Sequence, residues 1–344
     1  MKKETQKAAV LLALLLTAAA ALLGFAAPAR QGAKDGLDLA ESTVLPSLLP
    51  LLMLFLLIQN TKAGQLLCRG LTVPAKLLRL PAAAAGALLF GQIGGYPTGA
   101  VLTDALLAQG QITKDVARRL LCLNLCGGMG FICTAIGTAV LGNSAAGWLL
   151  LLSDICANLT LALLTLPFTQ RHRSAAESSV PPLFLGDALP AAAKSATESL
   201  LQLSAWIILF SALAAVVPVP KLLLPLFEIT AGLCTGTAYT LPQMAAFLAF
   251  GGVCVHLQLL GYMGRCGLSY FTFLAARACA ALLADGYCRI WLRLFPQAAA
   301  VFSNGVQALP RSGVGNKAFT VLLLTGALVF AMDLLQRRRR LAWI

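Results

Sequence analysis

The stretches that decide the fold are Gly94-Gly95-Tyr96-Pro97-Thr98-Gly99-Ala100 and Gly251-Gly252-Val253-Cys254-Val255-His256-Leu257-Gln258. Each places a Gly-Gly pair between two apolar arms of about 11 to 14 residues, which would span only about 17 to 21 Å as helices. A bilayer has a hydrocarbon core about 30 Å thick, so no arm crosses it alone. The sequence therefore predicts two re-entrant helical hairpins, around 82–109 and 240–266, and broken helices of this kind usually line a solute site.

The composition indicates a membrane protein. Hydrophobic residues make up 59% of the 344 residues, charged residues make up 11%, and the mean hydropathy is +0.82. One soluble core could not hide so much apolar surface, and several apolar runs are long enough to span a bilayer. We expect an all-α polytopic protein of about 7 to 8 transmembrane helices in a bacterial cell membrane.

The net charge of +13 indicates membrane orientation rather than nucleic-acid binding. The cations lie in short clusters between apolar runs, which is typical of cytoplasmic loops. With a cytoplasmic N-terminus, the basic loops 60–81, 111–119 and 169–194 all fall inside, and the two hairpins enter from opposite faces. The clusters are Lys62, Arg69, Lys76 and Arg79; Lys114, Arg118 and Arg119; Arg171 and Arg173; Arg289 and Arg293; and Arg337 to Arg340.

The sequence contains no familiar metal-binding or catalytic motif. Nearly all ten cysteines lie in or beside apolar segments and no CxxC pair occurs, so we expect buried thiols and no metal or cofactor. The sequence has no HExxH, no GxSxG and no P-loop, and Asp104, Asp154 and Asp333 are scattered. We do not expect an enzyme.

The chain divides into two halves. We expect an uncleaved N-terminal transmembrane helix (1–30), a first repeat (31–170), a connecting loop (171–194), a second repeat (195–335) and a basic tail (336–344). Further spans are predicted at 44–59, 120–141, 148–168, 195–217, 268–284 and 319–335. Seven crossings would leave Arg337 to Arg340 outside, so either 285–301 hides an eighth crossing or one span is wrong.

A shift of 157 residues aligns the halves. It places Glu41-Ser42 on Glu198-Ser199, Ser47 on Ser204, Gly94-Gly95 on Gly251-Gly252, and Gly110 on Gly267. Matches at polar and glycine positions in one register indicate an internal repeat. Combined with the charge pattern, they predict two inverted-topology repeats.

The first Gly-Gly stretch favours an anionic solute. A helix that breaks inside a membrane frees N–H and C=O groups, which a polar solute or ion can satisfy. Gly94, Gly95 and Gly99 admit close backbone approach, and the arm that begins at Pro97 directs N–H groups and a positive dipole to the same point. Tight helix packing is the alternative explanation for the Gly-Gly pairs.

Three carboxylates are candidates for coupling or solute binding. Glu41, Glu198 and Glu228 lie at the edge of, or inside, apolar stretches, where a charge is costly. Glu41 and Glu198, with Ser47 and Ser204, are candidates for H⁺ or Na⁺ coupling, although the two glutamates could also be surface residues in a first helical turn. Glu228 precedes Thr230 and Gly232, which favours a site.

Several polar residues near the breaks complete the candidate site. Each could contact the solute or form a hydrogen bond between helices instead. Asn124 stands one turn before Gly127-Gly128-Met129-Gly130, a run that we expect to weaken or kink its helix. The candidate solute-binding residues are Gly94, Gly95, Tyr96, Pro97, Thr98, Asn124, Glu228, Thr230, Gly251, Gly252, His256 and Gln258.

Four motifs together resemble a known family. They are Val44-Leu45-Pro46-Ser47-Leu48-Leu49-Pro50, Gly95-Tyr96-Pro97-Thr98-Gly99-Ala100, Glu228-Ile229-Thr230-Ala231-Gly232, and Phe250 to Gln258. Over about residues 40–335 the chain resembles the YlbJ-like sporulation integral membrane proteins, which carry a nucleoside-recognition or Gate domain. The chain departs from them at Gly94, where a serine is expected, and at 127–130, where a motif with proline is expected.

The resemblance implies a transporter built from inverted repeats with re-entrant hairpins. It implies dipicolinic acid as the solute, moved across a forespore membrane during sporulation. A nucleoside or another small metabolite on the same fold is one alternative, and a non-transporting membrane scaffold for spore maturation is another. We expect the lipid bilayer, the solute and H⁺ or Na⁺ as partners and no nucleic acid, and the sequence leaves a homo-oligomer open.

Overall fold

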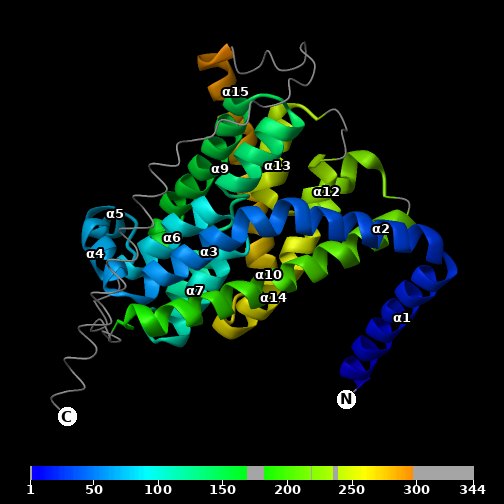
Figure 1. The fold of residues 1–344 in the computed structure, drawn as a ribbon, viewed down its shortest axis with the longest axis horizontal. Coiled ribbons are helices and arrows are strands. Elements are labelled where there is room, and N and C mark those ends of the chain that lie inside the picture. The colour runs from blue at the N-terminus through cyan, green and yellow to red at the C-terminus, as the bar shows by residue number, and fades with distance from the viewer. Residues whose placement is uncertain (1, 169–181, 218, 235–238, 297–344) are drawn as a thin grey trace.

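The fold is known from a computed structural model, which describes residues 2–168, 182–217, 219–234 and 239–296 (Figure 1). Within these residues the chain forms helices and no strand. Five runs are long and apolar enough to cross a membrane, which confirms the prediction of an all-α polytopic membrane protein. The runs are Ala26–Asn60, Ser144–Leu164, Leu185–Val216, Leu241–Cys266 and Tyr270–Leu294. The predicted span 319–335 and tail 336–344 lie outside the described residues.

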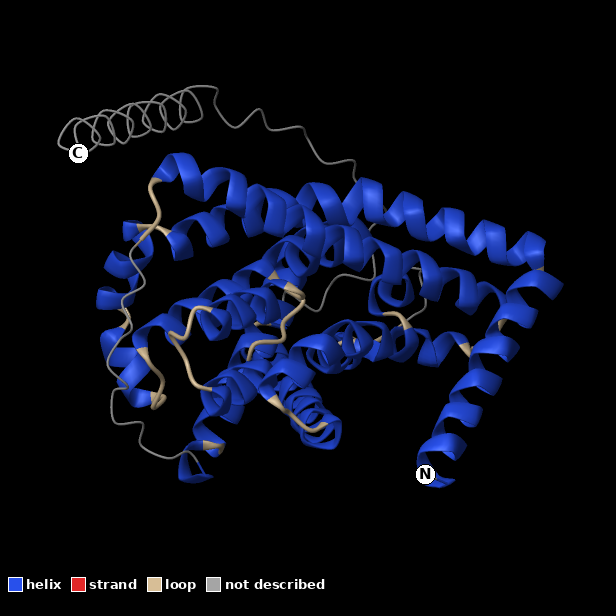
Figure 2. Cartoon of the chain, turned by 90° about the horizontal axis from the view of Figure 1, so that it is seen from below, coloured by secondary structure: helices blue, strands red, loops and turns tan. Residues whose placement is uncertain are grey.

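The N-terminal helix α1 (Lys2–Gly24) projects from the rest of the molecule (Figures 1 and 2). The chain then turns at Phe25 into α2 (Ala26–Leu39), which continues through the π-helical segment η1 (Ala40–Val44) into α3 (Leu45–Asn60). The predicted span 44–59 is therefore the second half of one 35-residue helical run.

The equivalent helix of the second half, α10 (Leu185–Val216), packs against this run in the opposite direction. Gly32 and Gly36 face Ser211 at one end of the pair, and at the other end the Leu183 N–H donates to the Asn60 carbonyl at 2.9 Å. The two helices are therefore antiparallel. Because the 157-residue register makes these helices equivalent, their antiparallel packing is the arrangement that inverted halves require.

The first half continues with short helices and a helical pair. Helices α4 (Lys62–Gly70) and α5 (Thr72–Leu77) are followed by α6 (Ala82–Gly94) and α7 (Thr98–Ala108), which pack against each other. The two arms predicted from the first Gly-Gly stretch therefore exist, and each is too short to cross a membrane alone.

The predicted span 120–141 is interrupted at its glycines. Helix α8 (Lys114–Leu123) starts at Thr113, whose hydroxyl accepts from the Val116 N–H, and residues 124–128 are not helical. The chain resumes as the π-helical segment η2 (Gly130–Val140) and then as α9 (Ser144–Leu164), followed by the 3₁₀ turn η3 (Leu166–Phe168). The expectation that the glycine run breaks this helix is confirmed.

After α10, the second half continues with the turn η4 (Lys221–Leu223) and the helices α11 (Leu224–Phe227), α12 (Ile229–Cys234), α13 (Leu241–Phe250), α14 (Gly252–Cys266) and α15 (Tyr270–Leu294). Helix α13 packs against α9 and α15, whereas α14 packs against α8, α10 and α11. Unlike α6 and α7, the helices α13 and α14 do not pack against each other as a hairpin. They form one 26-residue interrupted run that is long enough to cross a membrane, which differs from the re-entrant hairpin predicted around 240–266.

Helix α15 is longer than the predicted span 268–284. It continues to Leu294, so residues 285–294 are its last turns and not a separate crossing. Beyond residue 296 the question of an eighth crossing concerns residues outside the described part of the chain. The predicted domain boundaries and the crossing direction of the first hairpin stay predictions.

Candidate functional site

The two non-helical segments of the first half contact each other through their backbones. Gly95 and Gly128 both have positive φ angles, +82° and +77°. A Cβ on Gly128 would lie 2.5 Å from the Gly95 nitrogen, and the Tyr96 N–H donates to the Cys126 carbonyl at 2.8 Å. Glycine is required at both positions because a side chain would be strained and would collide with the facing chain.

Asn124 lies between the two arms α6 and α7. Its Nδ2 donates to the carbonyls of Ala87 at 2.9 Å and Gly99 at 3.3 Å, one on each arm. A Cβ on Gly91 or Gly99 would overlap Asn124, so the two glycines make the space that its side chain fills. Asn124 therefore holds the arms together, which is the interhelical role left open by the sequence.

Four polar side chains beside the break at 124–128 form one buried network. They come from three helices: Gln92 from α6, Asp154 and Asn158 from α9, and Arg277 from α15, and none is more than 5% exposed. The Arg277 guanidinium donates to the carbonyls of Leu125 at 3.2 Å, Ala249 at 3.3 Å and Cys122. It also donates to the Asn158 Oδ1 atom at 3.1 Å.

Asn158 connects the cation to the carboxylate of the same network. Its Nδ2 donates to Asp154 Oδ1 at 3.2 Å and to Gln92 Oε1 at 3.1 Å, and Asp154 Oδ2 accepts from the Gly127 N–H at 3.2 Å. Gln92 Nε2 donates to the Leu123 carbonyl at 3.0 Å. The network thus satisfies backbone groups that the break frees, which a membrane interior requires.

The sequence reasoning missed this network. In the sequence Asp154 stands among scattered aspartates, and no local motif marks Gln92, Asn158 or Arg277. A signal was present, because Asp154 and Arg277 each lie inside a predicted span, where an ionisable residue is costly and needs a partner.

A small cavity, which we name the inner cavity, lies where the two halves meet. Its volume is about 20 Å³, enough for about one water molecule or ion. Its polar lining residues are Ser47, Tyr96, Glu228, Thr230 and Gln258. Its remaining lining residues are Val44, Leu48, Gly127, Phe131, Leu203, Ile207 and Val255.

Glu228 places a carboxylate at the inner cavity. The side chain is 1% exposed, and its two oxygens accept from the N–H groups of Thr230, at 3.1 Å, and Ala231, at the start of α12. The break between α11 and α12 is therefore stabilised by the side chain that the sequence selected. The neighbouring Gly252 leaves room for this segment, since a Cβ there would lie 2.9 Å from the Pro225 carbonyl oxygen.

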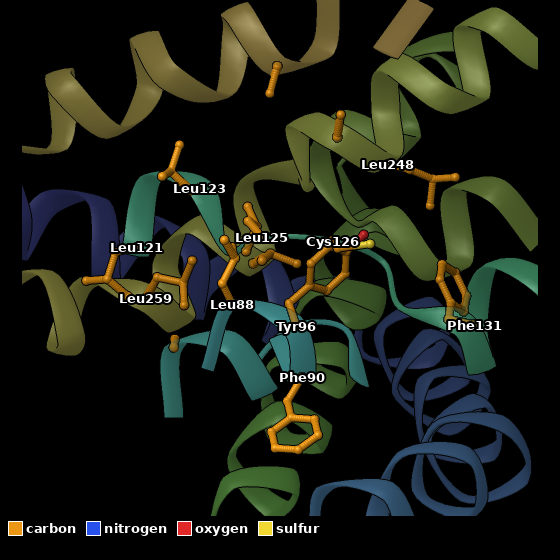
Figure 3. Close-up of a cluster of buried hydrophobic side chains, with 14 of the residues drawn as sticks. Leu88, Phe90, Tyr96, Leu121, Leu123, Leu125, Cys126, Phe131, Leu248 and Leu259 are labelled. Atoms are coloured by element: carbon orange, nitrogen blue, oxygen red, sulfur yellow. The ribbon is translucent and has the colours of Figure 1, made fainter. Parts of the chain in front are cut away.

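Two other polar atoms of the inner cavity's lining residues are buried without a hydrogen-bond partner among the described residues. They are the Tyr96 hydroxyl and the Gln258 Oε1 atom. Figure 3 shows the Tyr96 ring directed toward Cys126, away from Phe90 on the same helical pair. A buried polar atom without a partner costs about 1 to 3 kcal/mol, so these atoms mark where a polar solute or water would be favourable.

Other predicted residues lie away from the inner cavity. His256 is fully buried, with Nε2 at 2.9 Å from the Phe250 carbonyl oxygen and its ring packed against Phe273. A Cβ on Gly94 or Gly251 would meet Phe55 and Leu125, respectively. Thr98 is buried at the start of α7, directly after the cis Tyr96-Pro97 bond.

The four residues proposed for ion coupling do not lie together in the structure. Ser47 lines the inner cavity, and Ser204 is buried on α10, where its hydroxyl donates to the Leu200 carbonyl at 2.9 Å. Glu41 is exposed, and Glu198 is exposed beside Lys194, with 3.9 Å between their charged atoms. Both glutamates are exposed, but they lie in the middle of the runs Ala26–Asn60 and Leu185–Val216 and not in a first helical turn.

A second, larger cavity of about 510 Å³, here named the outer cavity, lies near the ends of α3 and α7. The sequence did not predict it. It is lined by amide side chains, one cation and one buried aromatic ring, among other residues. The polar and aromatic members are Gln59, Asn60, Thr61, Gln65, Arg69, Thr72, Gln109, Gln111 and Phe90.

The fold and the buried polar breaks define the class: the chain is an all-α polytopic integral membrane protein. It is similar to the sporulation integral membrane protein YlbJ of Bacillus subtilis (strain 168), with 25% identity over 323 aligned residues that cover 77% of this chain and 76% of that protein. No protein-family model matches the sequence, and no solved structure matches it.

Proposed function

We propose that the chain is a membrane transporter or permease for a small polar or anionic solute, and that the inner cavity is the closed form of its solute site. The observation that carries this is the convergence of broken helices from both halves on one cavity. Tyr96 follows the break in the first half, and Glu228 precedes α12 in the second. Discontinuous helices that meet between inverted repeats are the usual construction of a transporter site.

The size of the inner cavity agrees with an occluded state. Solute pockets generally measure about 300 to 1,000 Å³, whereas this cavity measures about 20 Å³. The halves must therefore separate to admit a solute, as alternating access requires. A membrane scaffold would need neither the matched breaks nor a buried carboxylate beside an unpartnered hydroxyl, so a carrier is favoured over a scaffold or an enzyme.

Dipicolinic acid, moved during sporulation, is the first solute that we propose. The name of the similar Bacillus protein supports a role in sporulation. Because Glu228 lines the cavity, an anionic solute would be accompanied by H⁺ or Na⁺ to offset the like charges. A nucleoside-like solute is the alternative, since its hydroxyl groups could donate to Glu228 and pair with Tyr96 and Gln258.

The test is uptake by the full chain in proteoliposomes. Labelled dipicolinate and labelled uridine are supplied separately, with a Na⁺ or a proton gradient. We expect one solute to accumulate, and we expect Gly252→Leu to abolish uptake because a side chain there meets the Pro225 carbonyl. Gly264→Leu on the same helix is the matched control, since no atom lies within 4 Å of a Cβ there. Failure to move either solute would overturn the proposal.

A further inference from the structure

The outer cavity has the size and the lining of a solute site in its own right. Its volume of about 510 Å³ is within the range of small-molecule pockets. Amides both donate and accept hydrogen bonds, and here Gln109 Nε2 donates to Asn60 Oδ1 at 3.3 Å while Gln111 Nε2 donates to Gln109 Oε1 at 2.6 Å. Arg69 adds a positive charge, so the polar lining suits carboxylate, amide or hydroxyl groups.

The outer and inner cavities share the same elements. Helix α3 lines the inner cavity with Ser47 and the outer cavity with Gln59, and the α6–α7 pair does so with Tyr96 and Phe90. Along α3, Phe55 lies about 12 Å from Ser47 and about 6 Å from Gln59. Phe55 therefore stands between the two cavities on the helix that borders both.

A stacked pair of aromatic rings fills this intermediate position. The rings of Phe55 and Phe90 are 4.5 Å apart between centroids and 14° from parallel, and both side chains are 8% exposed. Phe90 lines the outer cavity, and Phe55 contacts the α6 end, where a Cβ on Gly94 would lie 2.9 Å from its ring. Tyr96, two residues after Gly94, lines the inner cavity and points away from Phe90 (Figure 3).

We infer that the outer cavity is an access site for a planar polar solute, and that the Phe55–Phe90 stack is the closed gate between it and the inner cavity. This inference rests on the proposed transport function for the direction of use. The Phe90 ring, where it lines the outer cavity, offers an aromatic solute a stacking surface, and the surrounding amides and Arg69 bind its polar substituents. Rotation of either ring would join the access site to the inner cavity.

In the 157-residue register, the second half has no equivalent of the Phe55–Phe90 stack. In the 157-residue register, Phe55 is equivalent to Ala212 and Phe90 to Phe247. Phe247 packs edge-on against Tyr239 at 5.3 Å between centroids instead. The stack is therefore not a feature that the fold imposes on both halves.

Thiol accessibility tests the gate without requiring transport. Ser47→Cys places a thiol on the inner cavity, and the purified full chain is treated with a charged methanethiosulfonate reagent, with modified positions located by mass spectrometry. Cys68 lines the outer cavity and is the internal control that should react in every variant. We expect position 47 to be protected in the single variant and to react at least tenfold faster when Phe90→Leu or Phe55→Leu is added.

The matched control removes an aromatic pair elsewhere. Phe210 is 4% exposed and pairs with Phe227 at 4.8 Å in the second half, so Phe210→Leu perturbs a comparable contact. Leucine retains most of the volume and favours folding, which thermal unfolding of each variant verifies. Equal labelling of position 47 with Phe210→Leu, or continued protection with both gate variants, would refute the gate.

Transport measurements separate this inference from the proposed function. If the thiol at position 47 becomes reactive in the gate variants but neither dipicolinate nor uridine enters proteoliposomes, the gate is supported and the transport proposal is refuted. If a solute is transported while position 47 stays sealed in the gate variants, transport stands and the gate fails.

Discussion

The two halves of the molecule use equivalent segments in different ways. The segment 114–137 of the first half corresponds to 271–294 of the second, yet the first is broken at 124–128 and the second belongs to the continuous helix α15. The amino-acid composition of the two segments explains why one is broken and the other is continuous. Asn124-Leu125-Cys126-Gly127-Gly128-Met129-Gly130 contains three glycines, whereas Ala281-Leu282-Leu283-Ala284-Asp285-Gly286-Tyr287 contains one among good helix formers.

The continuous helix stabilises the broken one. Arg277 of α15 donates to the carbonyls of Cys122 and Leu125, and its own equivalent in the first half is Leu120. One half thus supplies an irregular backbone at the site, and the other supplies the cation that satisfies it. In the predicted 157-residue register, positions that correspond thus differ both in backbone conformation and in charge.

The largest effect that we predict is on Arg277, because it joins the two halves. Arg277→Met should lower the free energy of unfolding by about 3 to 5 kcal/mol, since it leaves Asp154 without its compensating charge and frees buried carbonyls. Thermal unfolding in detergent measures this. Arg289→Met on the same helix is the control, because Arg289 forms an exposed ion pair with Asp285 and its loss should leave the Tm unchanged.

A double variant sharpens this prediction. Arg277→Met combined with Asp154→Asn removes both charges, so it should be less destabilised than the sum of the two single variants. Additive effects would show that the two charges do not interact through Asn158, and the network described above would then be wrong.

The second prediction compares two glycines of similar backbone conformation. Gly128 and Gly110 have φ angles of +77° and +68°, but a Cβ on Gly128 meets Gly95 whereas nothing lies within 4 Å of one on Gly110. Alanine should cost about 1 to 2 kcal/mol at each for the left-handed conformation, with about 1 to 3 kcal/mol more at Gly128 for the collision. Denaturant unfolding of both variants tests this, and equal losses would contradict the contact between the two breaks.

The third prediction concerns the position of Asn124 between the arms. The three atoms nearest to a Cβ on Gly91 all belong to the Asn124 side chain, so Gly91→Ala should destabilise the native chain. In the Asn124→Ala background the collision is gone and the same change should be neutral or stabilising, because alanine favours helix over glycine by about 1 kcal/mol. Unfolding of the four proteins in this cycle gives the coupling energy, expected at about 1 to 3 kcal/mol, and a value near zero would remove Asn124 from between the arms.

Features that depend on local sequence could be predicted. The lengths of the arms and the break at Gly127 and Gly128 follow from glycine content and apolar run length, both of which act within a few residues. The repeat register was equally readable, because it compares the chain with itself. These features define the positions of the main helices and part of the lining of the inner cavity.

Features that depend on contacts between distant helices could not be predicted. Arg277 and Asp154 are separated by more than a hundred residues, and only the packing of α15 against α9 shows that Asn158 connects them. His256 was selected because it follows a glycine break, but the Phe250 carbonyl satisfies its ring instead. A polar residue near a helix break can hydrogen-bond either to a solute or to a backbone group, and only the three-dimensional contacts show which.

The smallest loss of stability that we predict is at Tyr96, where the comparison of the halves bears on function. Its hydroxyl is buried and has no partner among the described residues, so Tyr96→Phe should not destabilise the chain and should raise the free energy of unfolding by about 1 to 3 kcal/mol. Tyr270, beside the second break, is the control, since its hydroxyl lies 3.4 Å from His256 Nδ1 and away from the inner cavity. If the solute binds at the inner cavity, Tyr96→Phe should raise the KM of uptake several-fold and Tyr270→Phe should not. A KM that is unchanged in both would place the solute away from the break of the first half, and the Tyr96 hydroxyl would then be an unpaired group with no role in recognition.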